Sequence, residues 1–284
     1  MLESLHHALI DTAKILPFLF LTYLVLEWLE HKAAAKTTAI AAKAGTFAPA
    51  VGGLLGAIPQ CGFSASASSL YSGGIITLGT LVAIFLSTSD EMLPIMLSSD
   101  MALPRILSII AIKAAIGIAV GFLIDLLLKL LKKTPRRNTV AEICEEENCH
   151  CGEKGIVLSS LFHTLQVAIF VFVFTFLITW LIHIVGEDKL SEIASSAGIF
   201  GPLVAGLVGL IPNCASSVVL TTLFVEGVIS TGSMMAGLLA GSGVGLLVLF
   251  RIHKNVRENL TVAAIVYLSG VIFGILFDVF GIIL

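Results

Sequence analysis

Charged residues are scarce in this sequence, and their scarcity excludes an ordinary soluble domain. Lys, Arg, Asp and Glu make up 12% of the 284 residues, whereas a soluble globular domain carries about 25%. Hydrophobic residues make up 57%, and the mean hydropathy is +1.04. The formal net charge of −3 is too small to indicate a nucleic-acid partner, because nucleic-acid binding rests on clustered positive charge.

Cysteine is also sparse, and its placement excludes two further classes of protein. Of the five cysteines, Cys61 and Cys214 lie in apolar segments and the other three share one polar stretch. This is not the disulfide framework of a small secreted domain. Neither apolar cysteine has a C-x-x-C partner, which disfavours a thiol oxidoreductase. The G-x-x-x-x-G-K-[ST] phosphate loop is absent as well. We therefore expect no enzyme and no cofactor.

Long apolar runs are what the sequence has instead. They cover residues 15–29, 104–131, 156–185, 231–250 and 260–284. Several exceed the roughly 20 residues that a helix needs to cross the hydrocarbon core of a bilayer. The sequence therefore predicts an all-α polytopic membrane protein with about ten helical membrane segments, surrounded by lipid.

The chain repeats itself at an offset of 153 residues. Residues 44–64 align without a gap on residues 197–217, and twelve of the 21 positions are identical. The same offset aligns residues 107–125 on 260–278 with seven identities among 19 positions. A match of this kind indicates a duplication. We predict a first repeat over residues 1–131, a linker over 132–155 and a second repeat over 156–284.

The distribution of Lys and Arg predicts that the two repeats have opposite orientations. Positive residues concentrate in cytoplasmic loops. The linker is basic at its start, and the loop after the first span is basic too, so both should be cytoplasmic. The equivalent loop of the second repeat, "EDKLSEIASS", is net acidic and should face outward. Equivalent loops thus fall on opposite sides, which defines inverted-topology repeats.

Within each repeat the pattern predicts interrupted helices. A short segment ends at Ile-Pro, a Ser/Thr-rich return follows, and then comes a broken helix (residues 75–97 or 228–249) and a long span. The segment from about residue 46 to 59 is too short to cross a bilayer. We therefore expect re-entrant hairpins over 46–73 and 199–226 that meet near the midplane. Inverted repeats with broken helices are typical of secondary transporters.

The candidate substrate site lies at the two hairpin tips, residues 59–61 and 212–214. Each tip has a proline that frees backbone carbonyls, an amide side chain and a cysteine whose sulfur prefers soft ions. Hydroxyl side chains follow. An alternative is that the two sulfurs only pack while the amides and carbonyls bind. The predicted substrate-binding residues are Pro59, Gln60, Cys61, Ser64, Pro212, Asn213, Cys214 and Ser217.

Ionisable residues within apolar segments are candidates for proton or ion coupling. Asp90 and Glu91 interrupt one such segment, and Lys113 lies within another. We expect one of the two carboxylates to bind a cation or proton, with Lys113 as the compensating charge. Alternatives are a helix end near the outer surface for the carboxylates and a structural ion pair for the lysine. Asp125 and Asp278 occupy equivalent positions, and either cap helices or carry protons.

The linker holds a candidate metal site. Its sequence "EICEEENCHCGE" places Cys144, Cys149, His150 and Cys151 among five glutamates. Thiolates and imidazole select Zn²⁺, Cu⁺ or As(III) over Mg²⁺ and Ca²⁺. We expect either a loop that captures or senses a thiophilic ion, or an acidic linker that is only solvated.

The tip motif carries a resemblance to known transporters. The pattern Gly-x-x-Pro-x-Cys followed by small residues, together with "AIFLSTSDE", resembles the ArsP-type permeases. The length, the duplication and the Cys-rich linker are closer still to the related ten-helix heavy-metal exporters, which are also described as arsenic efflux or manganese transporter proteins. ArsP-type permeases commonly show a richer cysteine motif, whereas each tip here has one Cys.

From the residues and this resemblance we predict a secondary-active transporter of a bacterial cytoplasmic membrane. It would export a toxic metal or metalloid, either arsenic-type or a divalent metal, in exchange for protons. The expected partners are the small inorganic substrate and protons, with a homodimer as one possibility. The alternative is a passive channel for an ion or a small solute, which paired re-entrant hairpins would also suit.

Overall fold

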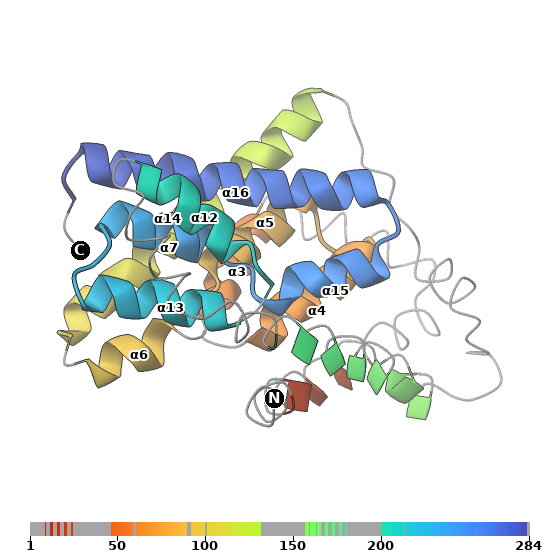
Figure 1. The fold of residues 1–284 in the computed structure, drawn as a ribbon. Coiled ribbons are helices and arrows are strands. Elements are labelled where there is room, and N and C mark those ends of the chain that lie inside the picture. Colours follow the sequence, from red (N-terminus) through yellow and green to blue (C-terminus); the bar gives the residue numbers. More distant parts are fainter. Residues whose placement is uncertain are drawn as a thin grey trace.

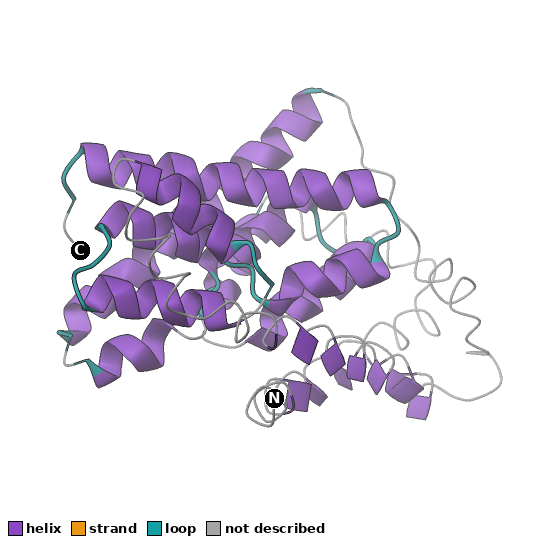
Figure 2. Cartoon of the chain, in the orientation of Figure 1, coloured by secondary structure: helices purple, strands orange, loops and turns teal. Residues whose placement is uncertain are grey.

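The computed structural model of the protein describes a helical molecule. The described residues are 47–58, 61–89, 92–99, 101–131, 200–212 and 214–282, with scattered positions between 9 and 24 and between 157 and 180. Within these residues there is no strand, as Figure 2 shows. Most of the apolar runs at 15–29 and 156–185 lies outside the described residues, as does the linker.

The helices recur at the offset that the sequence predicts. In the first repeat they are α3 (Ala48–Gly56), α4 (Cys61–Ser72), α5 (Leu78–Ser87), α6 (Met92–Ser98) and α7 (Leu103–Leu130). In the second they are α12 (Gly201–Gly209), α13 (Cys214–Val225), α14 (Thr231–Ala240), α15 (Val244–Ile252) and α16 (Val256–Val279). The bounds of α3, α4 and α5 differ from those of α12, α13 and α14 by 153 residues at both ends, and α7 and α16 begin at equivalent residues. Equivalent sequences therefore form equivalent helices.

Three stretches of the described chain are long and apolar enough to cross a membrane. They are Leu103–Leu130, Thr231–Ile252 and Val256–Val279. In the most apolar 18 residues of each, 44% of the first, 83% of the second and 33% of the third are buried inside the molecule. The apolar runs predicted at 104–131, 231–250 and 260–284 thus fall on helices: α7, the pair α14 and α15, and α16 up to Val279. The exposed leucines of α7 and α16, such as Leu123 and Leu268, have the character of a lipid-facing surface.

Glycines lie where α7 and α16 contact the broken helices. A Cβ added to Gly79 would lie 2.2 Å from the carbonyl oxygen of Gly121, and one added to Gly232 would lie 2.2 Å from that of Gly274. The backbones of α5 and α7, and of α14 and α16, therefore touch where they cross. Close backbone contact through small residues is how membrane helices gain packing energy where no water drives association.

The predicted broken helices are present in both repeats. α5 ends before Thr88 and α6 begins at Met92, while α14 ends before Gly241 and α15 begins at Val244. Gly243 has φ = 54°, a backbone conformation that only glycine adopts at low cost. Residues 241–243 therefore separate α14 from α15, within the broken helix that the sequence predicts over 228–249.

The two repeats interlock through α4 and α13. α4 packs closely along α15 of the second repeat, and α13 contacts α6 of the first repeat over a smaller area. In Figure 1, α4 and α15 lie together at one end of the molecule, and α6 and α13 lie together at the other. Each repeat thus supplies one helix to the broken helix of its counterpart.

Candidate functional site

The two tips lie where short helices give way to new ones. α3 and α12 have nine residues each, and both begin with proline in the first turn, at Pro49 and Pro202. Proline suits that turn because its missing N–H would have no partner there. α4 begins at Cys61 and α13 at Cys214, so each cysteine of the predicted site is the first residue of a helix.

Only part of each tip lies within the described residues. Pro212 is half-buried, and the carbonyl of Ile211 before it accepts a hydrogen bond from Ser216 Oγ at 3.3 Å. Pro59, Gln60 and Asn213 lie outside the described residues, as do the side chains of both cysteines. Their roles as ligands therefore stay predictions.

Ser64, a predicted substrate-binding residue, lies against the other repeat. It is fully buried in α4, and a Cβ added to Gly245 of α15 would lie 2.7 Å from Ser64 Cβ. One turn further on, Ser68 Oγ donates a hydrogen bond to Gly245 O at 2.6 Å. The residue equivalent to Ser64, Ser217, is half-buried in α13. The serine face of α4 therefore borders the break between α14 and α15.

Lys113 joins the two broken helices. Its side chain has no exposed surface, and its Nζ donates hydrogen bonds to Thr88 O and, at 2.9 Å, to Leu238 O. Thr88 is the C-cap of α5, and Leu238 lies in the last turn of α14. Carbonyls at a helix C-terminus lack intrahelical partners and carry partial negative charge. The ammonium therefore bridges the negative ends of two equivalent helices, one from each repeat.

Asp125 and Asp278 bind the starts of the broken helices. Asp125 accepts hydrogen bonds from Thr77 Oγ1 at 2.6 Å and from the Gly79 N–H at 2.9 Å. Asp278 accepts the equivalent two bonds, from Ser230 Oγ and from the Gly232 N–H, each at 2.9 Å. Carboxylates stabilise helix N-termini. Of the two roles that the sequence left open, the geometry accounts for capping; a role in proton transfer stays a prediction.

Several predicted residues lie outside the described part of the chain. Asp90 and Glu91 follow Thr88 within the first break, but their own placement is not among the described residues. The same holds for Cys144, Cys149, His150 and Cys151 of the linker. Among the residues that are described, no three His, Cys, Asp or Glu side chains gather to hold a metal ion.

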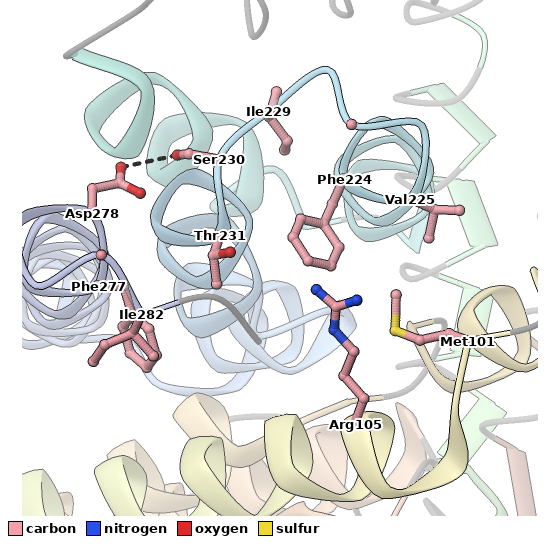
Figure 3. A pocket seen from close by; sticks show the side chains of 12 residues that line it. Met101, Arg105, Phe224, Val225, Ile229, Ser230, Thr231, Phe277, Asp278 and Ile282 are labelled. Carbon is pink, nitrogen blue, oxygen red and sulfur yellow. Dashed lines mark hydrogen bonds between the residues drawn. The ribbon is translucent and has the colours of Figure 1, made fainter.

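A cavity of about 420 Å³ lies beside the start of α14. Its walls come from the beginning of α7, the end of α13, the turn into α14 and the end of α16. Figure 3 shows the guanidinium of Arg105 projecting into it toward Phe224, with Asp278 on the far side bonded to Ser230. Arg105 is not among the residues that the sequence predicted for a site.

A second cluster that the sequence did not predict lies at the turn between α15 and α16. His253 is 3% exposed, and its Nε2 lies 2.9 Å from Glu258 Oε2. Its ring packs on Tyr71 at the end of α4, with 5.5 Å between ring centroids, and its carbonyl accepts a hydrogen bond from Asn259 Nδ2 at 2.7 Å. The alignment of the repeats could have drawn attention to both sites, because Arg105 and Glu258 are equivalent positions with opposite charges.

The paired helices, the exposed apolar surface and the buried polar breaks define a polytopic membrane protein made of two related halves. The comparison with family models gives the family. The model described as "Putative, 10TM heavy-metal exporter" matches residues 1–166 and again residues 153–282. The chain therefore belongs to this family of ten-helix membrane transport proteins, as the tip motif predicted. No curated protein and no solved structure matches the chain.

Proposed function

We propose that the protein is a secondary-active transporter that exports a toxic metal or metalloid in exchange for protons. Its place would be the cytoplasmic membrane of a bacterium. The observation that carries the proposal is the interlocking of α4 and α13 with the opposite repeat. Each of these helices starts at the cysteine of a Pro-x-Cys tip and packs on the broken helix of the other repeat, which supports our placing of the substrate path between the two repeats.

The arrangement of equivalent helices supports inverted topology. The start of α7, at Met101 and Arg105, lines the same cavity as the end of α16, at Asp278 and Ile282. Antiparallel packing of the equivalent helices α7 and α16 would bring their opposite ends together in this way. Antiparallel equivalents are what inverted repeats produce, and the Lys/Arg distribution favours the same interpretation.

The short helices support re-entrant hairpins. At 1.5 Å per residue, α3 and α12 are about 13 Å long, less than half of the roughly 30 Å hydrocarbon core. Non-helical backbone at the tips is tolerable in a membrane only where protein or a wet cavity surrounds it. We place the substrate at the tips, with Cys61, Cys214 and the two amides as its ligands.

The coupling step is assigned to the Lys113 junction. In transporters with discontinuous helices, the C-terminal ends of half-helices and unwound carbonyls coordinate the coupling cation. Here an ammonium takes that position between α5 and α14. We propose that proton transfer involving Lys113 and Asp90 or Glu91 changes the attraction between the two helix ends, and thereby couples proton movement to substrate release.

The test is transport into inverted membrane vesicles that hold an acidic lumen. A secondary exporter predicts uptake that saturates with substrate and collapses when a protonophore removes the pH gradient. A panel of As(III), methylarsenite, Mn²⁺, Zn²⁺ and Cd²⁺ identifies the substrate. Uptake that is linear in concentration and indifferent to the protonophore would refute coupled transport and favour the passive channel.

A further inference from the structure

The C-terminal ends of α4 and α13 are equivalent in sequence position. If the two repeats had identical conformations, the surroundings of these two ends would be alike. At one end, the cavity is lined by Phe224 and Val225 of α13 and by Arg105. At the other end, the equivalent positions are Tyr71 and Ser72 of α4 and Glu258. A comparison of the two ends therefore measures the conformational asymmetry between the repeats.

The exposure of equivalent side chains differs between the ends. Tyr71 is 8% exposed and Ser72 is 1% exposed. Their equivalents Phe224 and Val225 are both half-buried and line the cavity. The turn that follows continues the trend, because residues 226–228 are exposed whereas residue 73 is buried and residues 74–75 are half-buried. One end of the pair is closed and the other is open.

Side-chain contacts close the end that contains Tyr71. The His253 ring covers Tyr71, Glu258 holds His253 through Nε2, and Asn259 holds its carbonyl. At the open end, Arg105 occupies the position equivalent to Glu258, and its guanidinium projects into the cavity toward Phe224 (Figure 3).

The closed end contains polar atoms that lack hydrogen bonds. His253 Nδ1, Asn259 Oδ1 and Ser72 Oγ are buried without a partner in the described part of the chain. A buried polar atom without a partner destabilises the state that buries it, and water would satisfy it on opening. The closed end is therefore suited to open and close.

We propose that the Arg105 cavity is the open vestibule of the transport path, and that Tyr71, His253 and Glu258 form the closed gate at the opposite face. By the positive-inside distribution, the vestibule faces outward and the gate faces the cytoplasm. The structure then represents the outward-open state, which is the state that releases an exported substrate. The inference rests on the proposed function, because only alternating access gives the two ends separate states.

A matched pair of single-cysteine probes tests the asymmetry. Val225→Cys and Ser72→Cys occupy equivalent positions, so their labelling compares the vestibule with the gate. A membrane-impermeant maleimide is applied to intact cells and to inverted vesicles, and labelling is read at each residue by peptide mass spectrometry. We expect rapid labelling at Val225→Cys from outside and slow labelling at Ser72→Cys from the cytoplasmic side. Equal rates, or the reverse order, would overturn the proposal.

Loss of a gate contact should shift the equilibrium from the outward-open state toward the state that is open to the cytoplasm. His253→Ala in each probe background should raise labelling at Ser72→Cys and lower it at Val225→Cys, each by about fivefold, as expected for the loss of one partly exposed charged contact. Glu258→Gln preserves the shape of the cluster, and should give a shift of the same sign if His253→Ala fails to fold.

The outcomes separate this inference from the proposed function. Opposite shifts at the two probes support linked gates whichever ion is carried. A rise at Ser72→Cys with no change at Val225→Cys would show local loosening and refute the linkage. Coupled uptake with equal labelling at the two probes would retain the transporter and reject the gates. Unequal labelling with uptake indifferent to the pH gradient would retain the asymmetry and reject proton coupling.

Discussion

Replacement of Lys113 tests the junction between the broken helices. Lys113→Met removes the ammonium and leaves Thr88 O and Leu238 O without that donor. Each hydrogen bond to a charged group contributes about 1.5–3 kcal/mol, and a buried orphan acceptor costs a comparable amount. The desolvation of a buried charge opposes these gains. We therefore expect a net loss of about 2–4 kcal/mol of stability.

That loss is measurable in detergent. At roughly 2–4 °C per kcal/mol for a chain of this size, Lys113→Met should lower the melting temperature by about 5–15 °C. Val266, the residue equivalent to Lys113, is 1% exposed and shows that an apolar side chain fits the same position of the other repeat. The melting temperature is read by loss of the monodisperse peak after heating. No change in melting temperature would mean that the junction does not hold the helices together.

Lys113→Arg separates a structural role from coupling. Arginine keeps the charge and its donors, but it cannot give up its proton in a protein. We expect Lys113→Arg to retain most of the thermal stability, and to lose uptake driven by the pH gradient. A variant with normal melting and normal proton-driven uptake would refute the proposal that Lys113 takes part in coupling, and would leave it as a purely structural bridge.

Three further predictions address other parts of the molecule. Cys61→Ser or Cys214→Ser should sharply reduce As(III) binding, and the double variant should add little because residues of one site are not independent; full As(III) uptake in both would make the sulfurs packing groups. Gly232→Ala places a methyl 2.2 Å from Gly274 O and should cost about 1–3 kcal/mol or more by overpacking, measured by thermal unfolding. Gly227→Ala meets no atom within 4 Å and serves as its control, with only the strain of φ = +73°. Serine in place of all three linker cysteines should shift the concentration dependence of uptake and leave the maximal rate intact; complete loss in a well-folded variant would move the essential chemistry into the linker.

The repeat predicted much of the fold because it includes glycines at positions where the structure accepts no larger residue. Glycines such as Gly79 and Gly232 are duplicated where backbones touch, and a side chain there would separate the helices. Periodicity alone could not have found this, since apolar residues lie on both the buried and the exposed faces of α7 and α16. The duplicated glycines indicate the helix contacts, which the hydropathy does not indicate.

The candidate site was less predictable, because its specific features are those that break the symmetry. Lys113 stands where the second repeat has Val266, and its bonds to both helix ends depend on tertiary contacts between segments 25 and 125 residues away. The His253 cluster depends on the approach of α4 to α15. A single sequence indicates that such residues are exceptional, but it does not give their partners.

The exchange of α4 and α13 between the repeats constrains how such a protein could arise. A lone repeat would leave the surface that α15 covers on α4 open to lipid, with buried hydroxyls such as Ser64 and Ser68 exposed to hydrocarbon. Polar side chains are less stable against hydrocarbon than against protein, so the ancestral half would have needed a second copy of itself. With antiparallel halves, that copy would have to be inserted upside down. The gene duplication would then have fixed in one chain a dimer whose two subunits entered the membrane in opposite orientations.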